Sequence, residues 1–197
     1  MTSSQYGDNL YSIVKQIRLL IALMLFSLCN LPLAHAVVFT IDANLNSVSP
    51  IFYDANSDPD PFYSPSPLDT GLFLNQDDLL EIDASGIWSN APPSYNLIFG
   101  PDGNPNENIL PGYPGTGFPV AALLGKVGNN SYFFIGSSYS SHVSEGGVLY
   151  LGFNDTDYGN NTGSIEANVK VTAVPEPSSV LLFALGLLGL FTRRVLN

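Results

Sequence analysis

The sequence has very little cysteine and no apolar run of the about 20 residues that a permanent membrane span needs. Its 197 residues include a single cysteine, Cys29, near the N-terminus. Once the N-terminal segment is removed, the rest of the chain has no thiol and cannot form a disulfide. We therefore expect the folded part to be held together by an apolar core, with or without the help of a bound ion.

Basic residues are also scarce. Between Val37 and Val174 the only lysines or arginines are Lys126 and Lys170, against fifteen Asp and Glu, a formal net charge of −13. Such a surface repels phosphate backbones and anionic lipid headgroups, which excludes nucleic acid as a partner. The same field attracts divalent cations. Composition leaves the oligomeric state open.

No part of this region repeats its apolar residues at the spacing of an amphipathic helix. Short segments rich in apolar and β-branched residues recur instead, separated by Gly, Pro and Asn, which favours strands. We expect an all-β fold, a two-sheet antiparallel β-sandwich. Two Pro-rich stretches, 54–67 and 104–118, are expected as loops. The expected strands are Val37–Ala43, Gly71–Leu74, Leu79–Ala84, Tyr95–Phe99, Ala121–Val127, Ser131–Gly136, Gly147–Gly152 and Ile165–Val171.

The N-terminal segment has the order of parts of a signal peptide. Two basic residues, Lys15 and Arg18, precede an apolar run at 19–28, and a small-residue site ends at Ala36. This order predicts a signal peptide over residues 1–36, cleaved so that the mature chain begins at Val37. A membrane anchor is the alternative, but the run has only about half the length of a span.

The C-terminal segment carries a compact series of signals. Pro175, Glu176 and Pro177 precede a short apolar run at 180–191, and Arg193 and Arg194 follow it. The positive-inside rule would keep the arginines on the cytoplasmic side while the proline pair holds the motif extended.

This arrangement resembles the PEP-CTERM sorting tail, also catalogued as the ice-binding protein C-terminal domain. The resemblance implies a sorting signal over 175–197, with a short transmembrane helix that anchors the chain transiently, and processing by an exosortase. It also implies export to the cell envelope, the cell surface or the extracellular matrix. A permanent anchor is the alternative, although an apolar run of twelve residues is short for one.

The region between the two end segments, 37–174, is expected to be one domain. Its richest chemistry lies between the last two expected strands. Asp155, Asp157, Asn160 and Asn161 offer four oxygen-bearing side chains of the kind that bind Ca²⁺, and nearby glycines permit sharp turns. The same residue types are typical of any exposed hairpin turn. On spacing alone, the plain turn is the favoured interpretation.

A wider pattern resembles the PA-IL-type calcium-dependent lectins, which are galactose-binding β-sandwiches. It is carried by Asn154-Asp155 and Tyr158-Gly159-Asn160-Asn161, and by upstream segments at 75–86, 100–103 and 122–128. The resemblance implies a Ca²⁺ ion held by the side chains of Asp155, Asn160 and Asn161, the carbonyl of Asp157 and a carbonyl near Asn90. It also implies that Asp155, Asn160 and Glu107 lie at the carbohydrate site.

The chain departs from those lectins at the sugar site. The loop between Asp155 and Asp157 is two residues shorter, and Glu107 and Leu110 stand where the lectins use His and Gln on the sugar. We therefore expect calcium binding without a preference for galactose.

No catalytic constellation is visible. Serines lie next to His142, but nothing in the sequence arranges them as a nucleophile, a base and an orienting group. Trp88 is as well suited to packing in the core as to stacking on a sugar. We expect a protein that is not an enzyme and binds extracellular polysaccharide through a calcium-organised loop. The alternative is a structural matrix protein in which calcium only stabilises the fold.

Overall fold

The computed structural model describes residues 34–48, 66–91, 93–109, 111–156 and 160–174, together with the isolated residues 11, 15 and 18. Residues 34–173 form one compact unit. The predicted loop at 54–67 and the apolar run at 180–191 lie almost entirely outside the described residues. In the described ranges no helix is long and apolar enough to cross a membrane.

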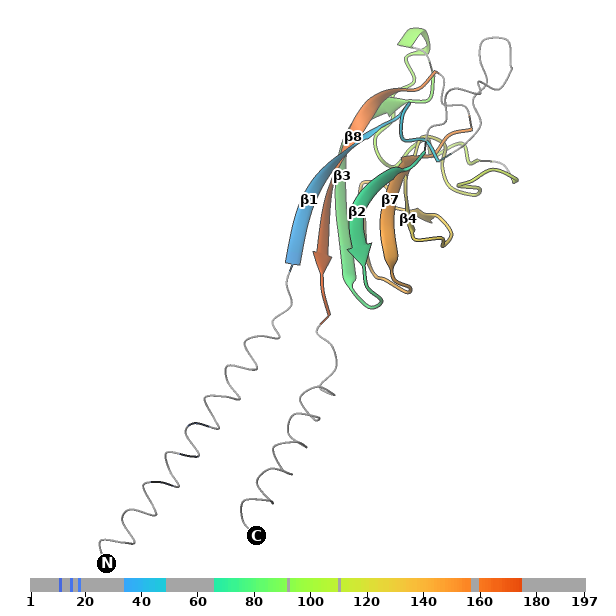
Figure 1. Ribbon diagram of the computed structural model, residues 1–197. Coiled ribbons are helices and arrows are strands. Elements are labelled where there is room, and N and C mark those ends of the chain that lie inside the picture. Colours follow the sequence, from blue (N-terminus) through green and yellow to red (C-terminus); the bar gives the residue numbers. More distant parts are fainter. Residues whose placement is uncertain are drawn as a thin grey trace, which may run out of the picture. The chain divides into compact units, whose positions relative to one another are not determined.

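The described residues form two four-stranded antiparallel sheets, as predicted (Figure 1). The first sheet has the order β1-β8-β3-β6 and the second has the order β2-β7-β4-β5. The strands are β1 (Ala34–Asp42), β2 (Leu68–Leu74), β3 (Leu79–Ser89), β4 (Leu123–Val127), β5 (Phe133–Phe134), β6 (Ser138–His142), β7 (Gly147–Phe153) and β8 (Thr162–Thr172). A short 3-10 helix, η1 (Pro93–Tyr95), follows β3.

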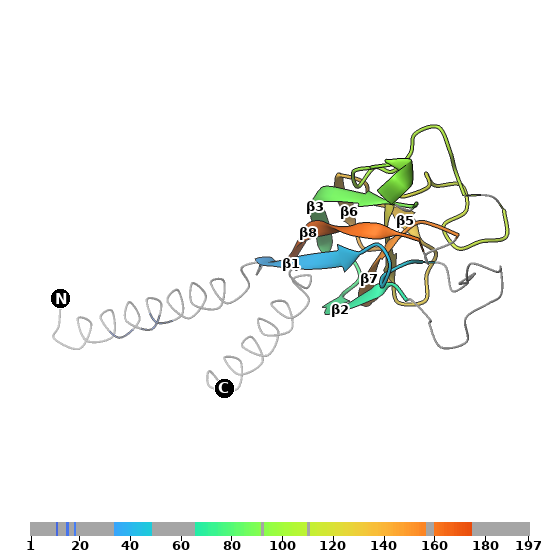
Figure 2. The same cartoon turned by 90° about the horizontal axis from the view of Figure 1, so that it is seen from above.

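One apolar face of each sheet packs against the other, and the facing side chains form the main buried core. In β8 the buried residues Ile165, Ala167 and Val169 alternate with exposed polar ones, which is the period of a strand with one face in the core. From the other sheet Leu149 and Leu151 of β7 belong to the same buried cluster. Figure 2 shows β8 lying between β1 and β3. Alternation in the sequence therefore fixed which face of these strands points inward.

Two strand predictions need correction. The predicted strand Tyr95–Phe99 is wrong: Asn96 has a φ of +51° that breaks the extended run, and only Phe99 pairs, through a single bridge to Trp88. Strand β6 was not predicted, because Ser-Tyr-Ser-Ser-His has almost no apolar or β-branched character. It forms at the sheet edge by pairing with Leu79–Asp83.

The predicted cleavage point between Ala36 and Val37 lies inside β1. Its first three residues, Ala34 to Ala36, pair with Lys170, Val171 and Thr172 of β8 and are exposed. Cleavage there would shorten an edge strand without removing any core side chain.

Long connections and short turns lie at opposite ends of the sandwich. The three long connections, 43–67, 90–122 and 154–161, join strands at one end, as the pairs Ser89–Thr162, Leu123–Phe153 and Leu68–Leu151 require. Short turns at 75–78 and 143–146 close the other end. The chain enters and leaves the domain there too, because Ala34 pairs with Thr172. Strand β8 separates the two ends by about 35 Å at roughly 3.4 Å per residue.

Candidate metal and carbohydrate site

Asp155 stands at the start of the 154–161 connection and is almost fully buried, with 6% of its surface exposed. The backbone of the preceding residue, Asn154, continues the pairing of β7 with the segment that leads into β4. Its N–H donates to the carbonyl of Ala122 at 2.9 Å, and its carbonyl accepts from the N–H of Ala121 at 2.7 Å. The Asp155 carboxylate accepts a 2.7 Å hydrogen bond from the N–H of Thr156. The sheet therefore sets the position of this carboxylate.

Asn161 ends the same connection and is 2% exposed. Its Nδ2 donates to the carbonyl of Ala43, just beyond β1, at 3.3 Å. Because the amide nitrogen is used in this way, Oδ1 is the atom of this side chain that suits a cation. Asn160 is half-buried beside it. Asp157, the remaining predicted ligand in the loop, lies outside the described residues.

Asn90 follows β3 directly, one step beyond the pair Ser89–Thr162. Extending that antiparallel register by one residue places Asn90 opposite Asn161. The Oδ1 atom of Asn90 is buried and accepts no hydrogen bond from the described residues. A buried acceptor without a donor is unfavourable unless something else compensates it. An amide oxygen of this kind is a good ligand for a hard cation.

Taken together, these residues fit a calcium ion chemically. Asp155, Asn161 and Asn90 bring oxygen atoms, two of them on almost fully buried side chains, to one end of the sandwich from the ends of β7, β8 and β3. Among the described residues no group of three or more His, Cys, Asp or Glu side chains gathers. A cation here would thus depend on amide and carbonyl oxygens, which Ca²⁺ accepts readily.

Glu107 lies on the long 90–122 connection at the same end of the sandwich. Its carboxylate accepts a 3.4 Å hydrogen bond from Nδ2 of Asn104, and its backbone carbonyl accepts from the N–H of Val120 at 2.8 Å. The side chain is exposed, and Leu110 lies outside the described residues. The connection is thus folded back on itself by its own hydrogen bonds.

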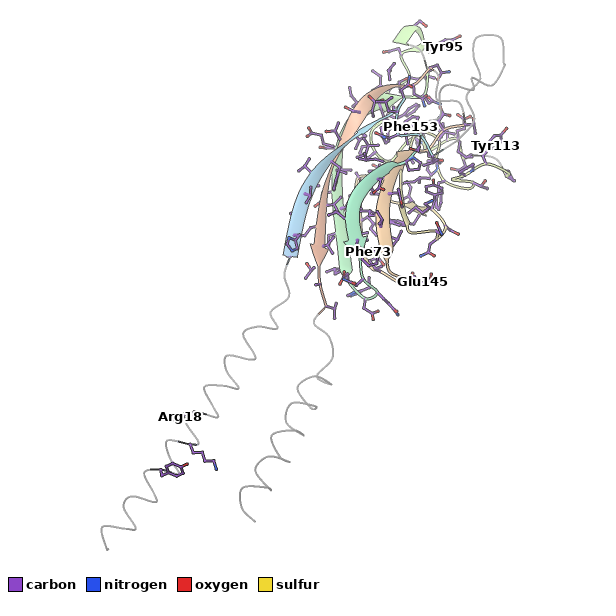
Figure 3. All side chains as sticks on the ribbon, in the orientation of Figure 1. Arg18, Phe73, Tyr95, Tyr113, Glu145 and Phe153 are labelled. Carbon is purple, nitrogen blue, oxygen red and sulfur yellow. The ribbon has the colours of Figure 1, made fainter. Side chains whose placement is uncertain are left out.

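Trp88 is a core residue and not a sugar platform. It is 1% exposed, and its ring meets the Phe153 ring edge-on with centroids 4.5 Å apart. Exposed aromatic and aliphatic side chains lie instead at η1 and just after it, where Tyr95 is 69%, Leu97 44% and Ile98 56% exposed. Figure 3 shows Tyr95 at the tip of the domain, beyond Phe153. The sequence predicted a strand here and therefore missed this exposed apolar segment. The absence of charged residues between positions 90 and 101 is the feature of the sequence that could have indicated it.

His142 lies in the edge strand β6, at the end of the sandwich opposite the candidate site. Its Nδ1 is 2.9 Å from the carbonyl of Asp77, with which it shares a hydrogen bond. It is exposed and has no part in the site formed by the long connections.

Residues 173–195 match the PEP-CTERM protein-sorting motif. The match confirms the predicted sorting tail and implies export, processing by an exosortase and sorting to the cell surface. The individual residues Pro175, Glu176, Pro177, Arg193 and Arg194 lie outside the described part of the chain.

Among solved structures, the chain is similar to the EclA N-terminal domain, a PllA-like lectin. The identity is 22%, the TM-score is 0.46, and the match covers 68% of this chain and 94% of that one. No curated protein sequence matches the chain. The predicted resemblance to a lectin is thus confirmed as a resemblance, at low identity, and by itself it assigns no activity.

Proposed function

We propose that this exported protein is a binding protein, not an enzyme, and that it binds extracellular polysaccharide at the long-loop end of its sandwich, with a calcium ion organising the site. The observation that carries the proposal is the presence of buried oxygen atoms on three strand ends at this end of the sandwich. Asp155 and Asn161 are almost fully buried, and the Asn90 amide oxygen has no donor among the described residues.

The ion would be held by the side chains of Asp155, Asn160 and Asn161, with Asn90 contributing through its carbonyl or its amide oxygen. The carbonyl of Asp157 completes the predicted set. When bound, calcium supplies positive charge and open coordination positions that sugar hydroxyl oxygens can fill. The protein's own contribution is to hold acidic and amide oxygens in place on strand ends, so that little ordering remains to be done on binding.

The end at which the chain leaves the domain agrees with this role. The tail follows β8, whose last residues pair with the first residues of β1, while the site lies at the other end of the same strands. A chain attached through its C-terminus thus leaves the domain at the end without the site.

The exported protein should be retained by immobilised neutral polysaccharides in calcium and released by a chelator. Release on chelation supports calcium-dependent binding. The alternative function, a matrix protein in which calcium only stabilises the fold, predicts no retention in either buffer but a calcium-dependent melting temperature. Retention that is indifferent to the chelator would contradict the role given to the ion.

A further inference from the structure

Asn154 joins two loops that are distant in the sequence. It is fully buried and immediately precedes Asp155. Its Nδ2 lies 3.4, 3.3 and 2.9 Å from the carbonyl oxygens of Gly115, Phe118 and Pro119. One amide nitrogen carries two hydrogens, so these three carbonyls share two donors. A single side chain therefore holds a whole turn of the 111–119 loop.

The other side of the same amide group faces Gly115. Its Oδ1 is buried and accepts no hydrogen bond from the described residues. A Cβ atom placed on Gly115 would lie 2.0 Å from this oxygen and 2.9 Å from Cγ of the same side chain. The loop can approach Asn154 this closely only because residue 115 has no side chain. A buried acceptor without a donor does not favour folding by itself.

The main chain of Asn154 is fixed as firmly as its side chain. Its backbone pairs in both directions with Ala121 and Ala122, so the residue cannot shift without breaking two hydrogen bonds. Asp155 follows on the same backbone. The position of the 111–119 loop and the position of the Asp155 carboxylate are thus both set at one residue.

We propose that Asn154 is a positioning residue that fixes the 111–119 loop relative to Asp155, and that this loop forms a wall that restricts which saccharides reach the ion. The inference rests on the proposed function and extends it: selection comes from a loop that supplies no ligand to the metal. Residues that orient metal ligands from outside typically change metal affinity by about 10- to 100-fold when altered.

The test is Gly115→Ala compared with Gly117→Ala in the exported protein. Both glycines have positive φ, +73° and +84°, so both alanines carry similar backbone strain. Only at position 115 does the new methyl group meet Asn154; at position 117 nothing lies within 4 Å. We expect Gly115→Ala to raise the calcium dissociation constant, measured by calorimetry, at least about tenfold. Gly117→Ala should leave this constant unchanged. Glycan-array profiles should change for Gly115→Ala alone.

A second variant distinguishes an effect on calcium binding from a folding defect. Asn154→Ser removes the amide without adding volume, and should also weaken calcium at least about tenfold. Combined with Gly115→Ala it leaves room for the methyl group, so the double variant should bind calcium no worse than Asn154→Ser alone. A lower melting temperature in chelator with wild-type calcium affinity, in either variant, would mean that Asn154 only holds the fold and would overturn the inference.

The outcomes separate this inference from the function beneath it. A wild-type protein that shows no heat of calcium binding would overturn the proposed function and this inference with it. A wild-type protein that binds calcium, with both glycine variants binding equally well, would overturn this inference alone. If Gly115→Ala has a reduced calcium affinity but an unchanged glycan profile, the 111–119 loop does not select saccharides.

Discussion

The indole nitrogen of Trp88 donates a 2.7 Å hydrogen bond to the carbonyl oxygen of Ala121. Ala121 has a φ of +60°, a conformation that alanine rarely adopts, and its N–H donates to Asn154. The only tryptophan of the chain thus supports the backbone on which Asp155 is placed.

Replacing Trp88 by Phe tests this structural role. The variant removes the donor from a buried carbonyl, which we expect to lower the free energy of unfolding by about 1–3 kcal/mol. Because Trp88 is 1% exposed, it does not contact the polysaccharide itself. Because it supports the backbone that precedes Asp155, we expect polysaccharide binding to weaken together with stability. Chemical denaturation and a binding assay on the same preparation measure both. Loss of binding with unchanged stability would indicate direct sugar contact instead.

Burial raises the pKa of the Tyr132 phenol above its usual 10.0. Burial disfavours the phenolate in the folded state, so the unfolded chain ionises first as pH rises. This contribution to stability is present below pH 10 and is lost as the pH rises through the higher folded pKa. The stability of Tyr132→Phe should therefore fall less steeply than wild type in this alkaline range. Identical slopes in denaturation measured at several pH values would contradict the assignment.

The two chain ends are predicted to be processed. N-terminal sequencing of exported material should begin at Val37, and mass spectrometry should find no peptide beyond about Ser179. Loss of Ala34 to Ala36 removes only exposed residues of β1, so the shortened domain should stay folded. Recovery of an intact Arg193-Arg194 terminus outside the cell would show that the tail is retained.

Galactose should be a poor ligand. Glu107 stands where the resembling lectins place a sugar-binding His, and its carboxylate is engaged by Asn104 within its own loop. We expect weak retention on immobilised galactose in calcium, compared with neutral polysaccharide. Strong retention that free galactose elutes would mean that the departures at Glu107 and Leu110 do not alter sugar preference.

Local patterns in the sequence predicted most of the strands, because alternating burial leaves a direct signature, as at Ile165, Ala167 and Val169. Strand β6 left none, since its polar residues are strand-forming only through their pairing with β3. The segment after η1 gave a false signal: its apolar residues are exposed, and Asn96 turns the chain.

Part of the candidate site was also predictable from local sequence. Asp155 and Asn161 stand out by residue type and spacing. The contact of Asn154 with the 111–119 loop joins residues 35 to 39 positions apart, and nothing in either segment alone indicates it. Such contacts depend on the folding of both sheets.

The central claim is that the Asp155–Asn161 connection binds calcium. The most direct measurement is the melting temperature of the exported protein in calcium and in chelator, for wild type, Asp155→Asn and Asp83→Asn. With free calcium at about 100 times Kd, the folded state gains about 2.7 kcal/mol, which should raise the melting temperature by several degrees. Asp155→Asn keeps the shape and the acceptor for Thr156 but removes one charge, so it should lose most of the rise while its stability in chelator changes little. Asp83→Asn makes the same charge change at an exposed position of β3 and should keep the rise. The same melting temperature in calcium and in chelator for the wild-type protein would contradict the account and leave the connection as a turn.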